Sequence, residues 1–296
     1  VVRSGRRARS ARPGGTDSVS SSIGSRAMKR SRVVLLWLAA IAITVGSAAW
    51  QRRTGPSYPI RGTATLSGES IPYRLLRSQI TGEALPVRIR ASAAIRGEVL
   101  WRRYPSNEVL RREVLARHGE ELTFDLPPQP PAGKLEYFVH LTNGLESVEL
   151  PPQTVVPRKG AVARFKGAVP AHVLVPHIAA MFFGMLFSNA AALSALARRS
   201  QSLRQAWMAF ALLAVGGLLL GPAVQKYAFD AWWTGWPFGH DLTDNKTAVA
   251  VVAWGIALLL SRGGRTARVA IVVAAVVTLA VFIVPHSMFG SELKVQ

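Results

Sequence analysis

Residues 227–246, YAFDAWWTGWPFGHDLTDNK, decide how this chain folds, because they form a short connection between two apolar segments. A connection that only joins two helices needs flexible polar residues. This one carries aromatic, acidic and imidazole side chains and a stiffening proline: Trp232, Trp233, Trp236, Phe238, His240, Asp230, Asp241, Asp244 and Pro237. Loops held by a scaffold and reached by water often carry function, so this loop is the first candidate for a functional site.

The composition predicts a membrane protein. The 296 residues are 49% hydrophobic, with a mean hydropathy of +0.22, yet the net charge is +20. Apolar spans alternating with basic loops reconcile these values. Cysteine is absent, which excludes disulfides, thiolate metal sites, cysteine nucleophiles and thioether-attached haem. The basic residues cluster beside apolar spans, so we expect the lipid bilayer and a membrane or periplasmic protein as partners, and no nucleic acid.

The N-terminus has the pattern of an export signal. Residues 1–32 are rich in Arg, Ser and Gly, and we expect them to be disordered. Met28 is followed by Lys29 and Arg30 and then by the apolar run Val33–Trp50, which is typical of a signal anchor or a signal peptide. We expect residues 33–50 to form a transmembrane signal anchor. Two questions stay open: whether this segment is cleaved near Ala49, and whether residues 1–27 lie upstream of the true start.

Residues 51–168 contain no apolar span and show strand and turn signals instead. The turns are rich in Gly, Pro, Asn and Ser, as in PPQPPAG and TNGLES. Several short strands at this spacing predict an exported β-sandwich. The expected strands are Ala64–Leu66, Val87–Ala91, Glu98–Tyr104, Leu122–Leu126, Lys134–Leu141 and Ser147–Leu150.

One run within this region resembles a known module. Residues 126–150, LPPQPPAGKLEYFVHLTNGLESVEL, are similar to the end of fibronectin-III and immunoglobulin-like modules, in which a Pro/Gly turn leads into a strand with tyrosine and then a hairpin. The resemblance implies an Ig-like fold that serves as a spacer or a docking surface.

Residues 169–296 predict a four-span transmembrane domain, a four-helix bundle. The expected spans are Val173–Ala197, Ala206–Phe229, Thr247–Ser261 and Ala267–Pro285. Arginines occupy the two turns within these pairs: Arg198, Arg199, Arg204, Arg262, Arg265 and Arg268. The positive-inside rule places both turns and the N-terminus in the cytoplasm of a bacterial-type inner membrane, and the β-domain and the Trp-rich loop outside.

This topology gathers three histidines at the outer face. His177 begins the second span of the chain, His240 lies in the loop, and His286 ends the last span. Both VPH sites place a proline before the histidine, which fixes the backbone there. Neutral histidine is a common metal and haem ligand, although a single histidine at a membrane boundary is more commonly an interfacial hydrogen bonder.

The order His177, Trp-rich loop, His286 resembles that of the haem-handling membrane proteins of cytochrome c assembly, the CcsA/CcmC type. The similarity covers the stretch from AFDAWWTGWPFGHDLTDNK into the next span, and IVPHSMFG at the end. That family's WGxxWxWDxxxT core is not reproduced, since His240 stands where an aromatic residue is expected. The resemblance implies that His177 and His286 are axial haem ligands, and that Lys226 or Lys246 meets the propionates. It also implies a shelf for the macrocycle, formed around Trp232, Trp233, Trp236 and Asp241.

Two other interpretations remain open. Met181 follows His177 by one helical turn and Met288 follows His286, and thioether with imidazole suits copper, although methionine commonly fills cores. In the structural interpretation, Asp241, Thr243 and Asp244 cap the next helix and the tryptophans form an interfacial belt. Gly217 and Gly221 predict close helix packing, with a kink at Pro222.

The sequence disfavours an enzyme, because no nucleophile elbow, phosphate loop or HExxH motif occurs. A transporter is disfavoured by span interiors without charge. The leading hypothesis is therefore a protein that binds or handles haem in an envelope redox or assembly system. The alternative is a non-catalytic accessory or scaffold protein whose β-sandwich docks a partner.

Overall fold

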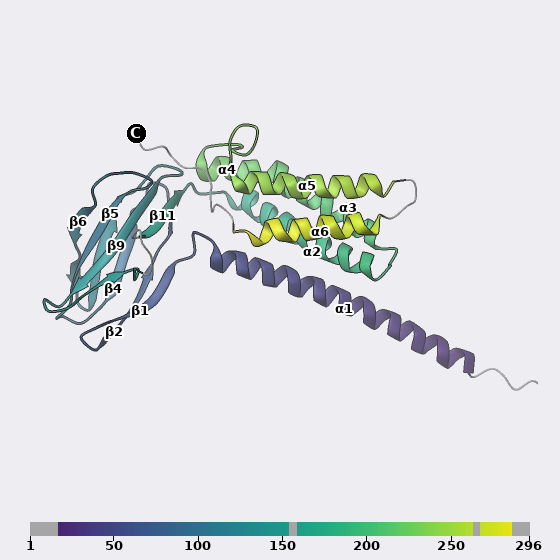
Figure 1. Ribbon diagram of the computed structural model, residues 1–296, viewed down its shortest axis with the longest axis horizontal. Helices are drawn as coiled ribbons and strands as arrows, with labels where there is room; N and C mark the ends of the chain where they lie inside the picture. The colour runs from purple at the N-terminus through teal and green to yellow at the C-terminus, as the bar shows by residue number, and fades with distance from the viewer. Residues whose placement is uncertain (1–16, 154–158, 263–266, 286–296) are drawn as a thin grey trace, which may run out of the picture.

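A long N-terminal helix, a β-rich region and a set of apolar helices follow one another along the chain (Figure 1). The computed structural model describes residues 17–153, 159–262 and 267–285, with side chains from residue 31 onward. The helices are α1 (Asp17–Thr54), α2 (Ala171–Leu196), α3 (Ser202–Ala214), the π-helical η1 (Val215–Leu220), α4 (Gly221–Phe229), α5 (Leu242–Leu260) and α6 (Arg268–Ile283).

The apolar helices indicate a membrane protein. Among the described residues, four stretches are long and apolar enough to cross a membrane: Ser31–Thr54, Ala171–Leu196, Ser202–Phe229 and Leu242–Leu260. The third runs through α3, η1 and α4 without a break. The last apolar helix, α6, has only 16 residues and is shorter than the other four.

The expectation of a disordered N-terminus is wrong for residues 17–32, because α1 begins at Asp17. Once the apolar span has nucleated a helix, each further residue adds one backbone hydrogen bond without a new nucleation cost. Low hydrophobicity therefore did not prevent helix formation next to the span.

Polar side chains attach α1 to the other helices. The amide of Asn189 donates to Thr44 Oγ1 over 3.0 Å between two buried residues. Near the β-region, Gln51 Nε2 donates to the carbonyl of Phe282 over 2.8 Å. Toward the other end, the rings of Trp37 and Phe187 meet edge to face at 5.7 Å. Hydrogen bonds between helices are favourable in lipid, where water offers no competing partner.

Helices α2, α3, α5 and α6 share one core built largely from alanine around Trp254, which is fully buried. The indole Nε1 of Trp254 donates to Thr278 Oγ1 over 2.9 Å, which joins α5 to α6. Small residues let these backbones approach closely, as is typical of helix packing in membranes.

The β-rich region contains three sheets. One is the hairpin of β1 (Ile60–Leu66) and β2 (Glu69–Leu75). The largest has the order β3 (Ser78–Ile80), β11 (Ala161–Lys166), β9 (Lys134–Thr142), β5 (Arg96–Arg103) and β6 (Arg111–Val114), with β10 (Ser147–Leu150) also paired to β9. The third is β4 (Leu85–Arg90), β8 (Glu121–Leu126) and β7 (Ala116–His118). Buried side chains of all three sheets join in one core.

The six strands expected from the sequence lie within or close to β1, β4, β5, β8, β9 and β10. The sequence analysis missed β2, β3, β6, β7 and β11. In β2 the alternation is present, with Ile71, Tyr73 and Leu75 buried. Pro72 disfavours a strand in the sequence, because proline has no amide proton to donate to a neighbouring strand. The short strands β3, β6 and β7 have no buried side chain, so they show no alternation of apolar and polar positions.

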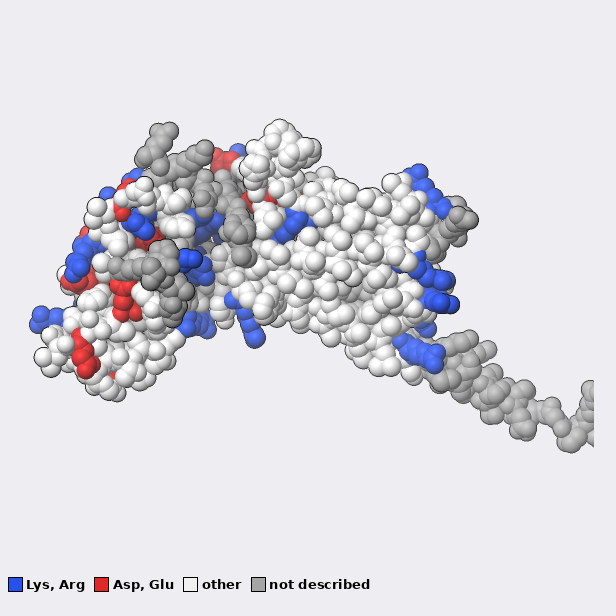
Figure 2. Space-filling view, in the orientation of Figure 1, with Lys and Arg blue, Asp and Glu red and all other residues white. Residues whose placement is uncertain are grey.

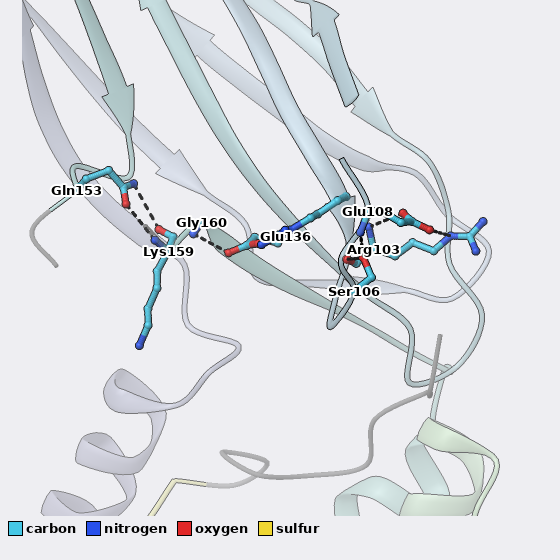
Figure 3. A network of polar contacts seen from close by, with 8 residues as sticks. Arg103, Ser106, Glu108, Glu136, Gln153, Lys159 and Gly160 are labelled. Carbon is cyan, nitrogen blue, oxygen red and sulfur yellow. Dashed lines mark hydrogen bonds and ion pairs between the residues drawn. The ribbon is translucent and has the colours of Figure 1, made fainter. Parts of the chain in front are cut away.

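A buried carboxylate fixes the chain where it enters β11 (Figure 3). Glu136 is almost fully buried, and its Oε2 accepts from Arg102 Nε and Nη2 over 2.9 and 2.6 Å. Its Oε1 accepts from the amide of Gly160 over 3.0 Å. Nearby, Lys159 N donates to Gln153 Oε1 over 3.0 Å. A buried charge is tolerated when it is paired and hydrogen-bonded in this way.

Beyond β11, the chain is tied to the end of α4, and we call these contacts the β–helix junction. The amide of Gly167 donates to the carbonyl of Ala228 over 2.8 Å. The Arg164 guanidinium lies over the Phe229 ring at 5.7 Å. A Cβ at Gly167 would overlap the carbonyl oxygen of Tyr227, so only glycine allows this close approach.

Candidate functional site

The loop between α4 and α5 projects from the helices as a short finger close to the β-region (Figure 1). We call residues 231–240 the aromatic finger. Its backbone is held by the first turns of α5. Asp244 Oδ2 accepts from the amides of Thr234 and Gly235 over 2.7 and 3.0 Å. Asn245 Oδ1 accepts from the amide of Trp236 over 2.7 Å. The finger is therefore an organised element.

Asp241 has the capping role that the structural interpretation predicts. It is the N-cap of α5, and its Oδ1 accepts from the amide of Thr243 over 2.7 Å. A carboxylate at this position satisfies a backbone donor that has no partner within the helix. Asp241 also faces Thr234 Oγ1, which lies 3.2 Å from Oδ2.

The aromatic side chains of the finger face outward. Trp232, Trp236 and Phe238 are 61%, 74% and 82% exposed, and His240 is exposed as well. Trp233 is half-buried, and its Nε1 donates to the carbonyl of Trp236 over 3.1 Å. The two cavities that His177 lines, described below, are bordered by none of these side chains. The shelf expected around the tryptophans stays a prediction.

His177 is held in one tautomer by the π-helical segment η1. Its Nδ1 lies 2.8 Å from the carbonyl oxygen of Gly216. A carbonyl oxygen only accepts, so the ring proton is on Nδ1 and donates to it, which leaves the Nε2 lone pair free for a ligand or a proton. Gly216 permits the approach of α2, since a Cβ there would lie 2.9 Å from Ala180 Cβ and from Met181 Sδ. Single π-helical turns are frequent at functional sites.

Two cavities meet at His177, and both are also lined by Met181 and Val224. The smaller one, of about 130 Å³, extends toward the first turns of α5 and includes Asp241, Asp244 and Thr247. The larger one, of about 320 Å³, extends toward α1 and α6. Its walls are mostly apolar, with Leu174, Ile178, Phe182, Met185 and Phe282, and with Gln51 as a polar group. This volume is within the range of small-molecule sites, about 300–1,000 Å³.

His286 and Met288 lie outside the described residues, so the pairing of His177 with His286 stays a prediction. The described chain ends at Pro285. Just before it, Lys246 Nζ donates to the carbonyl of Val284 over 2.6 Å, so this lysine holds the end of α6. The other candidate for propionates, Lys226, pairs with Asp230 over 2.6 Å.

The described residues supply one imidazole ligand, not a complete metal site. No group of three or more His, Cys, Asp or Glu side chains in this part of the chain could hold a metal ion. Met181, which lines both cavities with His177, is the soft group next to it. The donor set thus fits haem or copper only in part. It offers one ring nitrogen, Nε2, on an imidazole whose other nitrogen is hydrogen-bonded, which is how proteins orient a histidine ligand.

Sequence reasoning found His177, Met181 and Asp241 but missed other groups around them. Gln51, Val224 and Thr247 reach the cavities from α1, α4 and α5, and the carbonyl of Gly216 in η1 accepts from His177. The adjacent glycines at 216 and 217 were the one local signal for a close helix contact at this level. Comparison of the chain with protein-family models, with curated proteins and with solved structures finds no match.

Proposed function

We propose that this protein binds or handles haem in an envelope redox or assembly system, with Nε2 of His177 as the iron ligand that the described residues supply. The observation that carries the proposal is the hydrogen bond from His177 Nδ1 to the Gly216 carbonyl. This bond fixes the tautomer in which Nε2 can ligate, and it orients the ring. Bound haem would supply redox-active iron, and His177 would hold it.

The larger cavity suits the apolar part of such a cofactor. Its mostly aliphatic and aromatic walls contact an apolar surface without burying unpaired charge. Met181 lies one helical turn after His177 and lines the same space. The same two residues support copper as the alternative cofactor, because thioether and imidazole ligands both bind copper.

The proposal includes an orientation in a bacterial-type inner membrane. Lys and Arg side chains gather at the end of the helices that lies away from the β-region, while the surface between is largely uncharged (Figure 2). Arg198 and Arg199 follow α2 directly, and Arg262 follows α5. By the positive-inside rule, this end is cytoplasmic, and the β-region and the aromatic finger are outside.

Finer descriptions of the two folded regions belong to the same proposal. The antiparallel order of β4, β8 and β7 and the core shared with the sheet of β9 and β5 support an immunoglobulin-like sandwich. The core shared by α2, α3, α5 and α6 supports a four-helix transmembrane bundle.

An absorption spectrum of the protein, purified in detergent from haem-replete cells, tests the function. We expect a Soret band that is lost or strongly shifted in His177→Ala. The matched control is His172→Ala, because His172 lies on the same helix, is exposed and lines neither cavity. A colourless protein that takes up no haem on titration, or equal spectra for the two variants, would contradict the proposal. Metal analysis of the same samples decides the copper alternative.

A second candidate function is that of a non-catalytic accessory protein, and the exposed aromatic finger favours it. Large aromatic side chains are enriched in protein interfaces, and the finger presents three of them at the end of the helices toward the β-region. A photo-crosslinking residue at Phe238 would then give one discrete protein adduct in cells, and His177→Ala would leave that adduct unchanged. Adducts with lipid alone would assign the finger to the membrane interface.

A further inference from the structure

A wedge-shaped groove opens between α1 and the turn that joins α2 to α3, at the end of the helices away from the β-region. The two helices are in contact at Trp37 and Phe187, but toward its N-terminus α1 runs away from the other helices (Figure 1). The space between them measures about 920 Å³. It is lined by Arg32 and Leu35 from α1 and by Arg198 and Arg199 from the turn.

The lining of this groove has two kinds of surface. Three guanidinium groups, of Arg32, Arg198 and Arg199, line it together with Ser200 and Gln201. Leu35 and Leu36 supply apolar surface one turn farther along α1. The basic residues form part of the larger group of Lys and Arg side chains at this end of the molecule (Figure 2). A ligand that fits must therefore be anionic at one end and apolar next to it.

We propose that the groove binds an anionic phospholipid, with its phosphate among the three arginines and its acyl chains against Leu35 and Leu36. In a bilayer, a wedge between two spans is filled by lipid, because an empty gap forfeits its packing contacts. Guanidinium groups select phosphate, which they bind through paired hydrogen bonds. Basic pockets between spans are recognised sites for acidic head groups. This proposal does not depend on haem binding.

A buried polar group behind the groove supports the same ligand. A narrow void of about 10 Å³ adjoins the groove and shares Leu36, Arg199 and Gln201 with it. Gln205 also lines this void; it is only 5% exposed, and its Oε1 has no hydrogen-bond partner in the described part of the chain. A buried acceptor without a donor is unfavourable. The hydroxyl groups of a phosphatidylglycerol head group, or one water beside it, provide that donor.

Lipid binding is measured by native mass spectrometry of the full chain after delipidation in detergent, with phosphatidylglycerol and phosphatidylcholine added in separate titrations. We expect at least tenfold tighter binding of phosphatidylglycerol. Arg32→Gln and Arg198→Gln should each weaken it roughly fivefold, the effect expected of one basic side chain near an anionic head group. Arg53→Gln is the matched control, since Arg53 is exposed at the opposite end of the same helix.

Three results would overturn the proposal. One is equal affinity for the two lipids, and another is a loss in Arg53→Gln as large as in Arg32→Gln. The third is full competition by inorganic phosphate alone, which would reduce the site to a phosphate site without lipid. The melting temperature of each variant without lipid shows whether it is folded, and the double variant Leu35→Ser with Leu36→Ser tests the acyl contacts without changing charge.

Discussion

At the scale of single residues, Asp244 decides the shape of the aromatic finger. It is 7% exposed and accepts from two consecutive amides of the finger, those of Thr234 and Gly235. These hydrogen bonds are charge-assisted and shielded from water, which makes them stronger than neutral ones. Gly235 is required beside it, because a Cβ there would lie 2.7 Å from Asp244 Cβ.

We therefore predict that Asp244→Ala loosens the finger without unfolding the helices. The buried amide of Gly235 and the partly buried amide of Thr234 lose their acceptor, which costs up to about 1–3 kcal/mol for a buried donor. Limited proteolysis should then cut near Trp236, and acrylamide should quench tryptophan fluorescence more strongly. Asp230→Ala is the control, because Asp230 forms an exposed ion pair with Lys226, a kind of pair that contributes little to stability. Equal protease resistance of the two variants would show that Asp244 does not hold the finger.

Single-residue patterns located His177 but not its partner. The VPH pattern predicts the histidine near the start of a span, and the structure places His177 in the second turn of α2. Gly216, which holds the ring, is 39 residues away. A hydrogen bond across that separation depends on how two helices pack, which no local pattern encodes. The tryptophans are predicted from the sequence to lie in a loop, whereas their outward direction follows from the contacts of Asp244 and Asn245.

At the scale of elements, η1 is the part of the helices that the sequence predicted least well. The pattern of Gly217 and Gly221 predicted close packing at both glycines, with a kink at Pro222. The structure instead widens the helix over Val215–Leu220 and places Pro222 in the first turn of α4, where the missing amide proton of proline matters least. Close packing occurs at Gly216 and Gly217, because these two face α2 and α5.

Substitutions at Gly217 and at Gly221 should therefore have different effects on stability. A Cβ at Gly217 would overlap Thr247 Cγ2, and Thr247 cannot turn freely because its Oγ1 donates to the carbonyl of Thr243 over 2.9 Å. Overpacking of this kind costs about 1–3 kcal/mol, so Gly217→Ala should lower the melting temperature in detergent. At Gly221 the nearest atom is 3.5 Å from the added Cβ. Gly221→Ala should be neutral or stabilising by up to about 1 kcal/mol, and a larger loss there than at Gly217 would refute the packing argument.

Among the strands too, a local sequence pattern was enough to predict some, whereas others depend on residues far away in the chain. The alternating run of β9 and the turns beside it were sufficient to predict that strand. By contrast, β11 pairs in parallel with β3 and antiparallel with β9. Its neighbours come from residues 78–80 and 134–137, so its place in the sheet is fixed by the packing of the whole β-region.

At the scale of the whole molecule, the charges predict one orientation across the membrane. A reporter fused after Ser200 should be cytoplasmic, because Arg198 and Arg199 hold that turn inside. A reporter fused after Gly239, in the aromatic finger, should be exported. Alkaline phosphatase and green fluorescent protein fusions at both positions provide paired readouts. The reverse pattern would invert the molecule and place the β-region and the cavities around His177 on the cytoplasmic side.

Through the β–helix junction, a movement of the β-region would be transmitted to the wall of a cavity. Arg164 lies over Phe229, and Phe229 lines the smaller cavity beside His177. The Gly167–Ala228 hydrogen bond joins the two parts at this point. We expect that a partner bound to the sheets moves Phe229 and so changes the cavity. Because coupling between two sites is reciprocal, a ligand in the cavity should also tilt the sheets. Distances between spin labels on β5 and α5, compared with and without ligand, would record the tilt.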